Sequence, residues 1–151
     1  MRRFAIISIL VVAIGSGALR EYLFVNLNYQ IDHVGRATEF SYADSTFKAW
    51  TLGWDLQRLE VLKWTFAVGY VVLLTTLAVW MARLLFGHSR HARYIVVAVF
   101  GVAGLALLLH LLSAWLPPLA DVAVKLLHML QYPVVLLVLL AANALGRASA
   151  K

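Results

Sequence analysis

The sequence predicts an all-α membrane protein, a four-helix transmembrane bundle with both termini on the cytoplasmic side. Hydrophobic residues fill 63% of its 151 positions and charged residues only 13%, about half of the ~25% that is usual in soluble domains. The apolar residues also gather in stretches close to the ~20 residues that a helix needs to cross a bilayer. The length suits one domain, so residues 1–151 are expected to form a single integral membrane domain.

Four spans follow from the apolar stretches. The first combines a short apolar run that begins at Phe4 with the run Tyr22-Leu23-Phe24-Val25, and the Arg20 side chain is expected to extend to the interface. A secretory signal peptide is the alternative for this segment, because Met1-Arg2-Arg3 precedes a short apolar core and small residues at 15–18. The expected spans are residues 4–25, 61–86, 94–116 and 122–145.

The first connection, residues 21–58, is the only sizeable segment expected outside the membrane, and it is rich in aromatic residues. Asp44 is a suitable N-cap for a short helix that carries Phe47, Trp50 and Trp54 at helical spacing. Tryptophan favours the membrane–water interface. We therefore expect this helix to lie on the outer membrane surface and to be broken at Gly53. A docking surface for a partner is the alternative function of the segment.

The charges orient the chain. Every acidic residue lies in the first or third connection or at its edge, whereas the basic N-terminus, second connection and C-terminus contain none. An excess of Lys and Arg marks the cytoplasmic side, which predicts a multi-pass protein of the inner membrane. The net charge of +6 is thereby accounted for, and no nucleic-acid motif accompanies it. The absence of cysteine excludes disulfides, thiolate metal sites and a cysteine nucleophile.

Polar residues interrupt the last span at helical spacing. Asp121, Lys125, His128 and Tyr132 are four, three and four residues apart, which places them on one face of a helix. His110 lies near the outer end of the third span. Counted from the expected span ends, His110 and His128 are both ~10 Å inside the outer boundary. The five residues form the predicted polar cluster, and Pro133 beside it is expected to kink the helix.

The polar cluster has several interpretations. Asp121 and Lys125 can pair while the histidines and Tyr132 form hydrogen bonds that hold the helices together, and we expect Lys125 to neutralise Asp121 in such a network. The face can instead contact another membrane protein or a second copy of the chain. A third possibility is a haem b or metal site with His110 and His128 as ligands. Transport is disfavoured because no polar path continues inwards, and enzymatic activity because no nucleophile or oxyanion stabiliser is present.

The layout resembles that of small four-pass membrane proteins of Bacteroidetes-type bacteria, including those encoded beside exosortases. The shared motifs are Arg20-Glu21-Tyr22-Leu23-Phe24 at the end of the first span, Leu62-Lys63-Trp64 at the start of the second, and Gln131-Tyr132-Pro133 in the fourth. The resemblance implies a non-enzymatic accessory or assembly subunit in the lipid bilayer and transfers no catalytic residue. An exosortase itself is excluded, since that family depends on a cysteine nucleophile.

Overall fold

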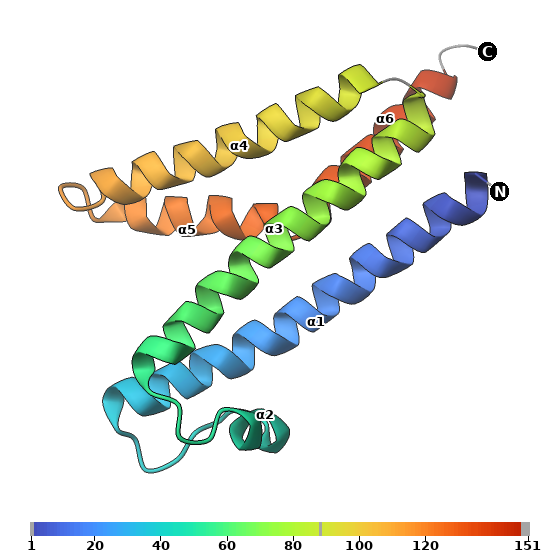
Figure 1. Cartoon of the computed structure of the whole chain (residues 1–151). Helices are drawn as coiled ribbons and strands as arrows, with labels where there is room; N and C mark the ends of the chain where they lie inside the picture. The colour runs from blue at the N-terminus through green and yellow to red at the C-terminus, as the bar shows by residue number, and fades with distance from the viewer. Residues whose placement is uncertain (1, 88, 149–151) are drawn as a thin grey trace. The chain divides into compact units, whose positions relative to one another are not determined.

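The computed structural model describes residues 2–87 and 89–148, and every regular element in this part of the chain is helical (Figure 1). The predicted all-α class is confirmed. Lys151 lies outside the described residues, and so do the side chains of Arg90 and Arg147, three of the basic groups used to predict the topology. The helices are α1 (Arg2–Arg36), α2 (Ser45–Trp50), α3 (Leu56–Phe86), α4 (Ser89–Leu112), α5 (Pro118–Leu130) and α6 (Val134–Ala148).

In the described chain, three helical segments are long and apolar enough to cross a membrane: α1, α3 and His91–Leu112 of α4. Helices α5 and α6 meet the same requirement only as a pair, and they are bent by 61° at the break between them. Each is ~20 Å long, shorter than the ~30 Å hydrocarbon core. The predicted four spans are therefore reached only if the bent pair counts as one span.

Helix α1 is longer than predicted. The first span was expected to end at residue 25, but the helix continues to Arg36 and is ~50 Å long. Polar residues after Val25 lower the local hydropathy, yet the apolar residues keep a helical repeat of four, four and three. These residues pack in one core cluster around the buried side chains of Leu27 and Leu59. The members of the repeat are Leu23, Leu27, Ile31 and Val34.

The connection between α1 and α3 contains the predicted short helix. The Asp44 side chain accepts a hydrogen bond from the Thr46 N–H at 2.9 Å, which confirms it as the N-cap of α2. The helix ends at Trp50, so Trp54 lies beyond it. Gly53 has a φ of 75°, a left-handed conformation that glycine adopts without steric cost. The side chain of Asp55 then accepts from the Arg58 N–H at 2.8 Å and caps the start of α3.

Contacts divide the chain into two compact units. The first unit consists of residues 1–14 and 71–151, and the second of residues 15–70. Each unit has its own apolar core. Met81 of α3 and Leu136 of α6 are fully buried in the core of the first unit, whereas Leu27 of α1 and Leu59 of α3 are fully buried in that of the second.

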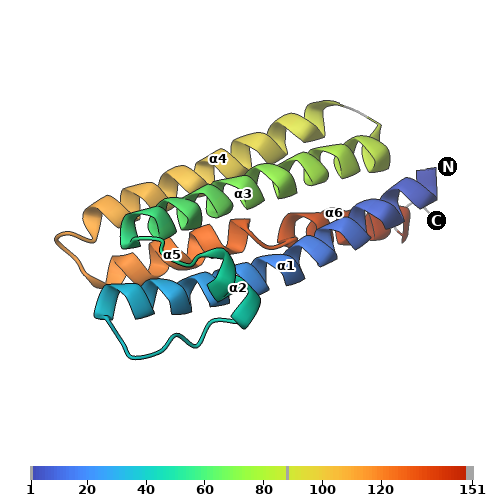
Figure 2. The same cartoon turned by 60° about the horizontal axis from the view of Figure 1, so that its bottom comes forward.

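Within the first unit, α4 and α5 lie side by side and antiparallel (Figures 1 and 2). The start of α1, the end of α3, the start of α4 and the end of α6 gather at one end of this unit (Figure 1). Helix α3 ends there at Gly87, whose φ is 71° and whose N–H bonds to the Arg83 carbonyl at 3.0 Å. This is a left-handed glycine cap.

Candidate functional site: the polar face of α5

Three of the predicted polar residues share the exposed face of α5. Asp121, Lys125 and His128 are all exposed, and the helix is continuous from Pro118 to Leu130. The opposite face of α5 carries the buried side chains of Ala123 and Leu130. We call Asp121, Lys125 and His128 the α5 polar face. Its members were correctly predicted to share one side of a helix.

Tyr132 does not continue this face, which corrects the prediction. Helix α5 ends at Leu130, and Gln131 is its C-cap with φ −91° and ψ 4°. Tyr132 therefore lies in the break before α6, with 37% of its surface exposed. The cause is Pro133, which has no N–H and disfavours the helical conformation of the residue before it. The expected kink is a full interruption of the helix.

His110 and His128 do not lie at the same depth. Helix α4 ends at Leu112 because the following residues form a turn, in which the Trp115 N–H bonds to the Leu112 carbonyl at 3.0 Å. His110 is thus ~3 Å from its helix end, whereas His128 is ~15 Å from the start of α5 at Pro118. The shared depth that favoured a haem or metal site between them is wrong.

A metal or haem site gains no support from other residues. Within the described residues, no group of three or more His, Cys, Asp or Glu side chains is arranged to hold a metal ion. His110 lies in the last turn of α4, exposed, at about the level of Asp121 in the first turn of α5. The haem b alternative with His110 and His128 as ligands stays a prediction, and the equal depth of the two histidines no longer supports it.

The expected ion pair within the α5 polar face is not formed. Asp121 and Lys125 make no ion pair and no side-chain hydrogen bond in the described chain, although their spacing allows one. Ion pairs do form elsewhere among the described residues, for example Arg20–Glu21 at 3.2 Å, Arg36–Asp32 at 2.8 Å and Arg58–Asp55 at 3.9 Å. Two opposite charges therefore stand exposed on one helix, each without a partner in the part of the chain that the structure describes.

A second group of polar residues, not predicted from the sequence, lies in the second unit. Arg20, Asn26 and Gln30 of α1 are buried, with 4%, 7% and 8% of their surfaces exposed. The Arg20 guanidinium lies 4.8 Å from the centre of the Phe24 ring and 3.2 Å from a Glu21 carboxylate oxygen. The expectation that Arg20 extends outwards to an interface is therefore wrong. Its burial beside an aromatic face is a cation–π arrangement.

Asn26 connects α1 to the start of α2. Its side-chain oxygen accepts a hydrogen bond from the Asp44 N–H, and its amide donates to the Tyr22 carbonyl at 2.8 Å. The Tyr22 hydroxyl in turn donates to the Asp44 carboxylate at 3.2 Å. The hydrogen bond from the Thr46 N–H is the main cause that lowers the pKa of Asp44, and the Tyr22 hydroxyl adds to it. These four residues are a structural connection between α1 and the cap of α2.

No protein-family model, curated protein or solved structure matches this chain. The resemblance to small four-pass membrane proteins accordingly stays an expectation from its short motifs. The α5 polar face remains the candidate site, on the strength of the exposed side chains of Asp121 and Lys125, which have no partner among the described residues.

Proposed function

We propose that this chain is a non-enzymatic accessory or assembly subunit of a membrane protein complex, and that the α5 polar face is its contact with another membrane protein. The observation that carries the proposal is the exposure of Asp121 and Lys125 without a partner in the described chain, on a helix between apolar candidate spans. An ionised group at the bilayer centre costs at least ~2.5–3.5 kcal/mol. A protein partner with complementary charges removes that cost.

The surroundings of the α5 polar face fit a protein contact. Val122, Val124 and Met129 are exposed beside it, so that apolar side chains flank a charged centre. Charged pairs desolvated in an interface define register and partner choice. The helix contains no serine, threonine or cysteine, so the face has no side-chain nucleophile of these types, and this supports the non-enzymatic role.

Site-specific crosslinking in native membranes tests the proposal. The chain has no cysteine, so Val124→Cys introduces a unique thiol beside the polar face, and Ala123→Cys introduces one on the buried face. We expect the Val124 position to crosslink to one defined membrane protein and to resist a water-soluble maleimide. A thiol at Ala123, which is buried within the chain, should give no crosslink. Rapid maleimide labelling at Val124 without a crosslink would mean that the face is open to water and would defeat the proposal.

We further propose that both termini are cytoplasmic, in the inner membrane, on the basis of the segregated charges. Reporter fusions should place residues near Thr38 and Pro118 outside, and residues near Ser89 and Lys151 inside. The fusion at Lys151 also tests whether α5 and α6 form one bent span. If the pair instead re-enters on the side from which it came, the Lys151 reporter will be outside while the Ser89 reporter stays inside.

A further inference from the structure

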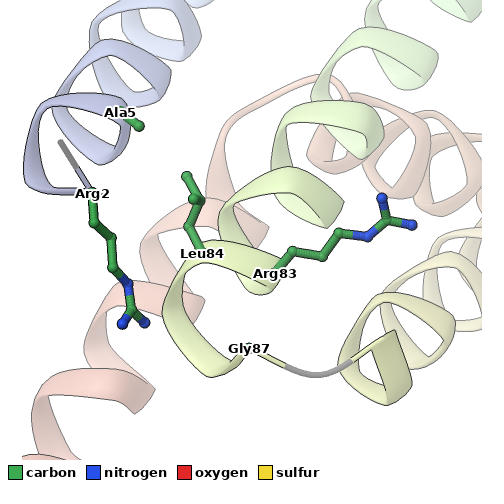
Figure 3. Close-up of a pocket in the computed structure, with 5 residues that line it drawn as sticks. All are labelled: Arg2, Ala5, Arg83, Leu84 and Gly87. Atoms are coloured by element: carbon green, nitrogen blue, oxygen red, sulfur yellow. The ribbon is translucent and has the colours of Figure 1, made fainter.

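An open groove lies at the basic end of the first unit, between the start of α1 and the end of α3. It is lined by Arg2, Ala5, Arg83, Leu84 and Gly87 and has a volume of about 580 Å³. Figure 3 shows Arg2 and Ala5 projecting from α1 and Leu84 from the last turn of α3, with the Arg2 and Arg83 side chains directed to different sides of that turn. The groove therefore has an apolar wall beside the Arg2 side chain, and Arg83 contributes to its lining from the other side of the turn.

Arg2 is held in place by the main chain of α3. Its Nη2 donates to the Leu85 carbonyl at 2.7 Å, one of the carbonyls that the end of a helix leaves without an intrahelical partner. A guanidinium has five N–H donors, so this bond fixes the group and leaves other donors for a ligand. A positioned guanidinium matches the oxygens of a phosphate better than a mobile ammonium does.

The charge at this end of the unit is positive only. Arg2, Arg3, Arg83 and Arg93 are exposed there, and residues 1–14 and 71–100 contain no Asp or Glu. Ala5 and Leu84 add an apolar wall next to the fixed guanidinium. An anion with a hydrocarbon chain is complementary to that combination, whereas a simple ion would use the charge and leave the apolar wall exposed.

We propose that this groove binds an anionic phospholipid, with the phosphate at Arg2, an acyl chain against Ala5 and Leu84, and Arg83 as a second cation at the rim. The proposal is independent of the α5 polar face. It differs from a general attraction of basic residues to an anionic surface, which is worth about a fivefold gain in affinity for each Lys or Arg wherever it lies. A bound lipid makes Arg2 more important than an equally charged residue outside the groove.

Native mass spectrometry and thermal unfolding of the full chain in detergent test this. Added phosphatidylglycerol should remain bound and raise the unfolding temperature, and phosphatidylcholine should do so at least fivefold less effectively. Arg2→Gln should lower phosphatidylglycerol binding by more than fivefold, whereas Arg93→Gln, which removes the same charge outside the groove, should lower it less than twofold. Equal losses in the two variants would overturn the proposal.

A second variant distinguishes lipid binding from the stabilisation that Arg2 gives to the end of α3 through its hydrogen bond to the Leu85 carbonyl. Ala5→Phe places a phenyl ring in the groove where the acyl chain is proposed to lie, and it changes no charge. This variant should stay folded but should no longer retain phosphatidylglycerol. Undiminished lipid binding in this variant would contradict the proposed acyl position. Inorganic phosphate and glycerol 3-phosphate serve as soluble probes. If either stabilises the protein as much as the lipid does, the ligand is a free phosphate compound and the lipid assignment fails.

Discussion

Asn26 on α1 accepts a hydrogen bond from the main-chain N–H of Asp44, eighteen residues later in the chain. Asp44 is also the N-cap of α2. One asparagine therefore joins the second half of α1 to the first turn of the helix in the connection. The geometry satisfies both ends of the Asn26 amide, since its nitrogen donates to the Tyr22 carbonyl at 2.8 Å.

Replacing Asn26 with leucine should destabilise the protein by about 1–3 kcal/mol, because the Asp44 N–H loses its acceptor in a part-buried position. Thermal or denaturant unfolding in detergent measures the effect. Asn28→Leu is the matched control, since Asn28 is exposed on the same helix, and it should change stability by less than about 0.5 kcal/mol. Similar effects in both variants would show that the hydrogen bond from the Asp44 N–H to Asn26 makes no measurable contribution to stability.

Gln30 should behave in the opposite way. It is as buried as Asn26, but its Oε1 has no hydrogen-bond partner among the described residues. An unsatisfied buried acceptor costs about 1–3 kcal/mol, so Gln30→Met, which keeps the shape and removes the acceptor, should be neutral or stabilising by up to about 1 kcal/mol. A clear loss of stability in the same unfolding assay would reveal a partner for this oxygen.

The Asp44 carboxyl should give the stability of the connection a dependence on pH. Hydrogen bonding, chiefly from the Thr46 N–H, lowers its folded-state pKa. Its stabilisation is therefore fully present above the unfolded-state pKa of about 3.9 and is lost as the pH falls below that value through the lower folded-state pKa. Asp44→Asn keeps a capping oxygen without the charge. The wild type should be more stable than this variant at pH 7, and the difference should shrink at pH 3.

Helical periodicity and capping residues predicted much of this fold, whereas contacts distant in sequence did not follow from them. Asp44 marks the start of the short helix through local chemistry that the sequence displays, whereas the helix ends at Trp50, three residues before the expected break at Gly53. The extension of α1 was missed because Asn26 and Gln30 lower the hydropathy, although the spacing of Leu27 and Ile31 continued the helix. The groove at Arg2 could not be predicted, because the Leu85 carbonyl that positions this side chain lies 83 residues away.

The same distinction applies to the α5 polar face. Spacing alone correctly placed Asp121, Lys125 and His128 on one side of a helix. The expected depths of His110 and His128 were instead counted from the end of one helix and the start of the next. In the structure α4 ends at Leu112 and α5 begins at Pro118, each four residues from the expected position, so the count no longer gives equal depths. Helix ends are the least certain feature of a sequence-based interpretation, so a site that depends on them is correspondingly insecure.

The end of α1 offers a test of backbone strain. Ala37 follows the helix with a φ of 49°, a left-handed conformation that costs a residue with a Cβ about 1–2 kcal/mol. Ala37→Gly should raise stability by about 0.5–1 kcal/mol, because relief of strain exceeds the added entropy of the unfolded chain. The control is Ala49→Gly in the interior of α2, which should lower stability by up to about 1 kcal/mol. Destabilisation at both positions would contradict the left-handed assignment.

The last prediction concerns the charges of the α5 polar face. Because Asp121 and Lys125 are exposed and unpaired in the described chain, Lys125→Met and Asp121→Asn should each change the stability of the isolated protein in detergent by less than about 0.5 kcal/mol. Their effects should also add in the double variant. Coupling above that size would restore the network expected from the sequence, in which Lys125 neutralises Asp121.

In native membranes the same variants should act strongly, because the proposed partner supplies the missing countercharges. In the Val124→Cys background, Lys125→Met and Asp121→Asn are each expected to reduce crosslinking by at least fivefold. The double variant should not recover it, since both charges of the partner are then left unpaired. Recovery in the double variant would mean that Asp121 and Lys125 interact with each other across a contact between two copies of the chain. Unchanged crosslinking in both single variants would remove the charges from the interface altogether, and the α5 polar face would then have no role in binding a partner.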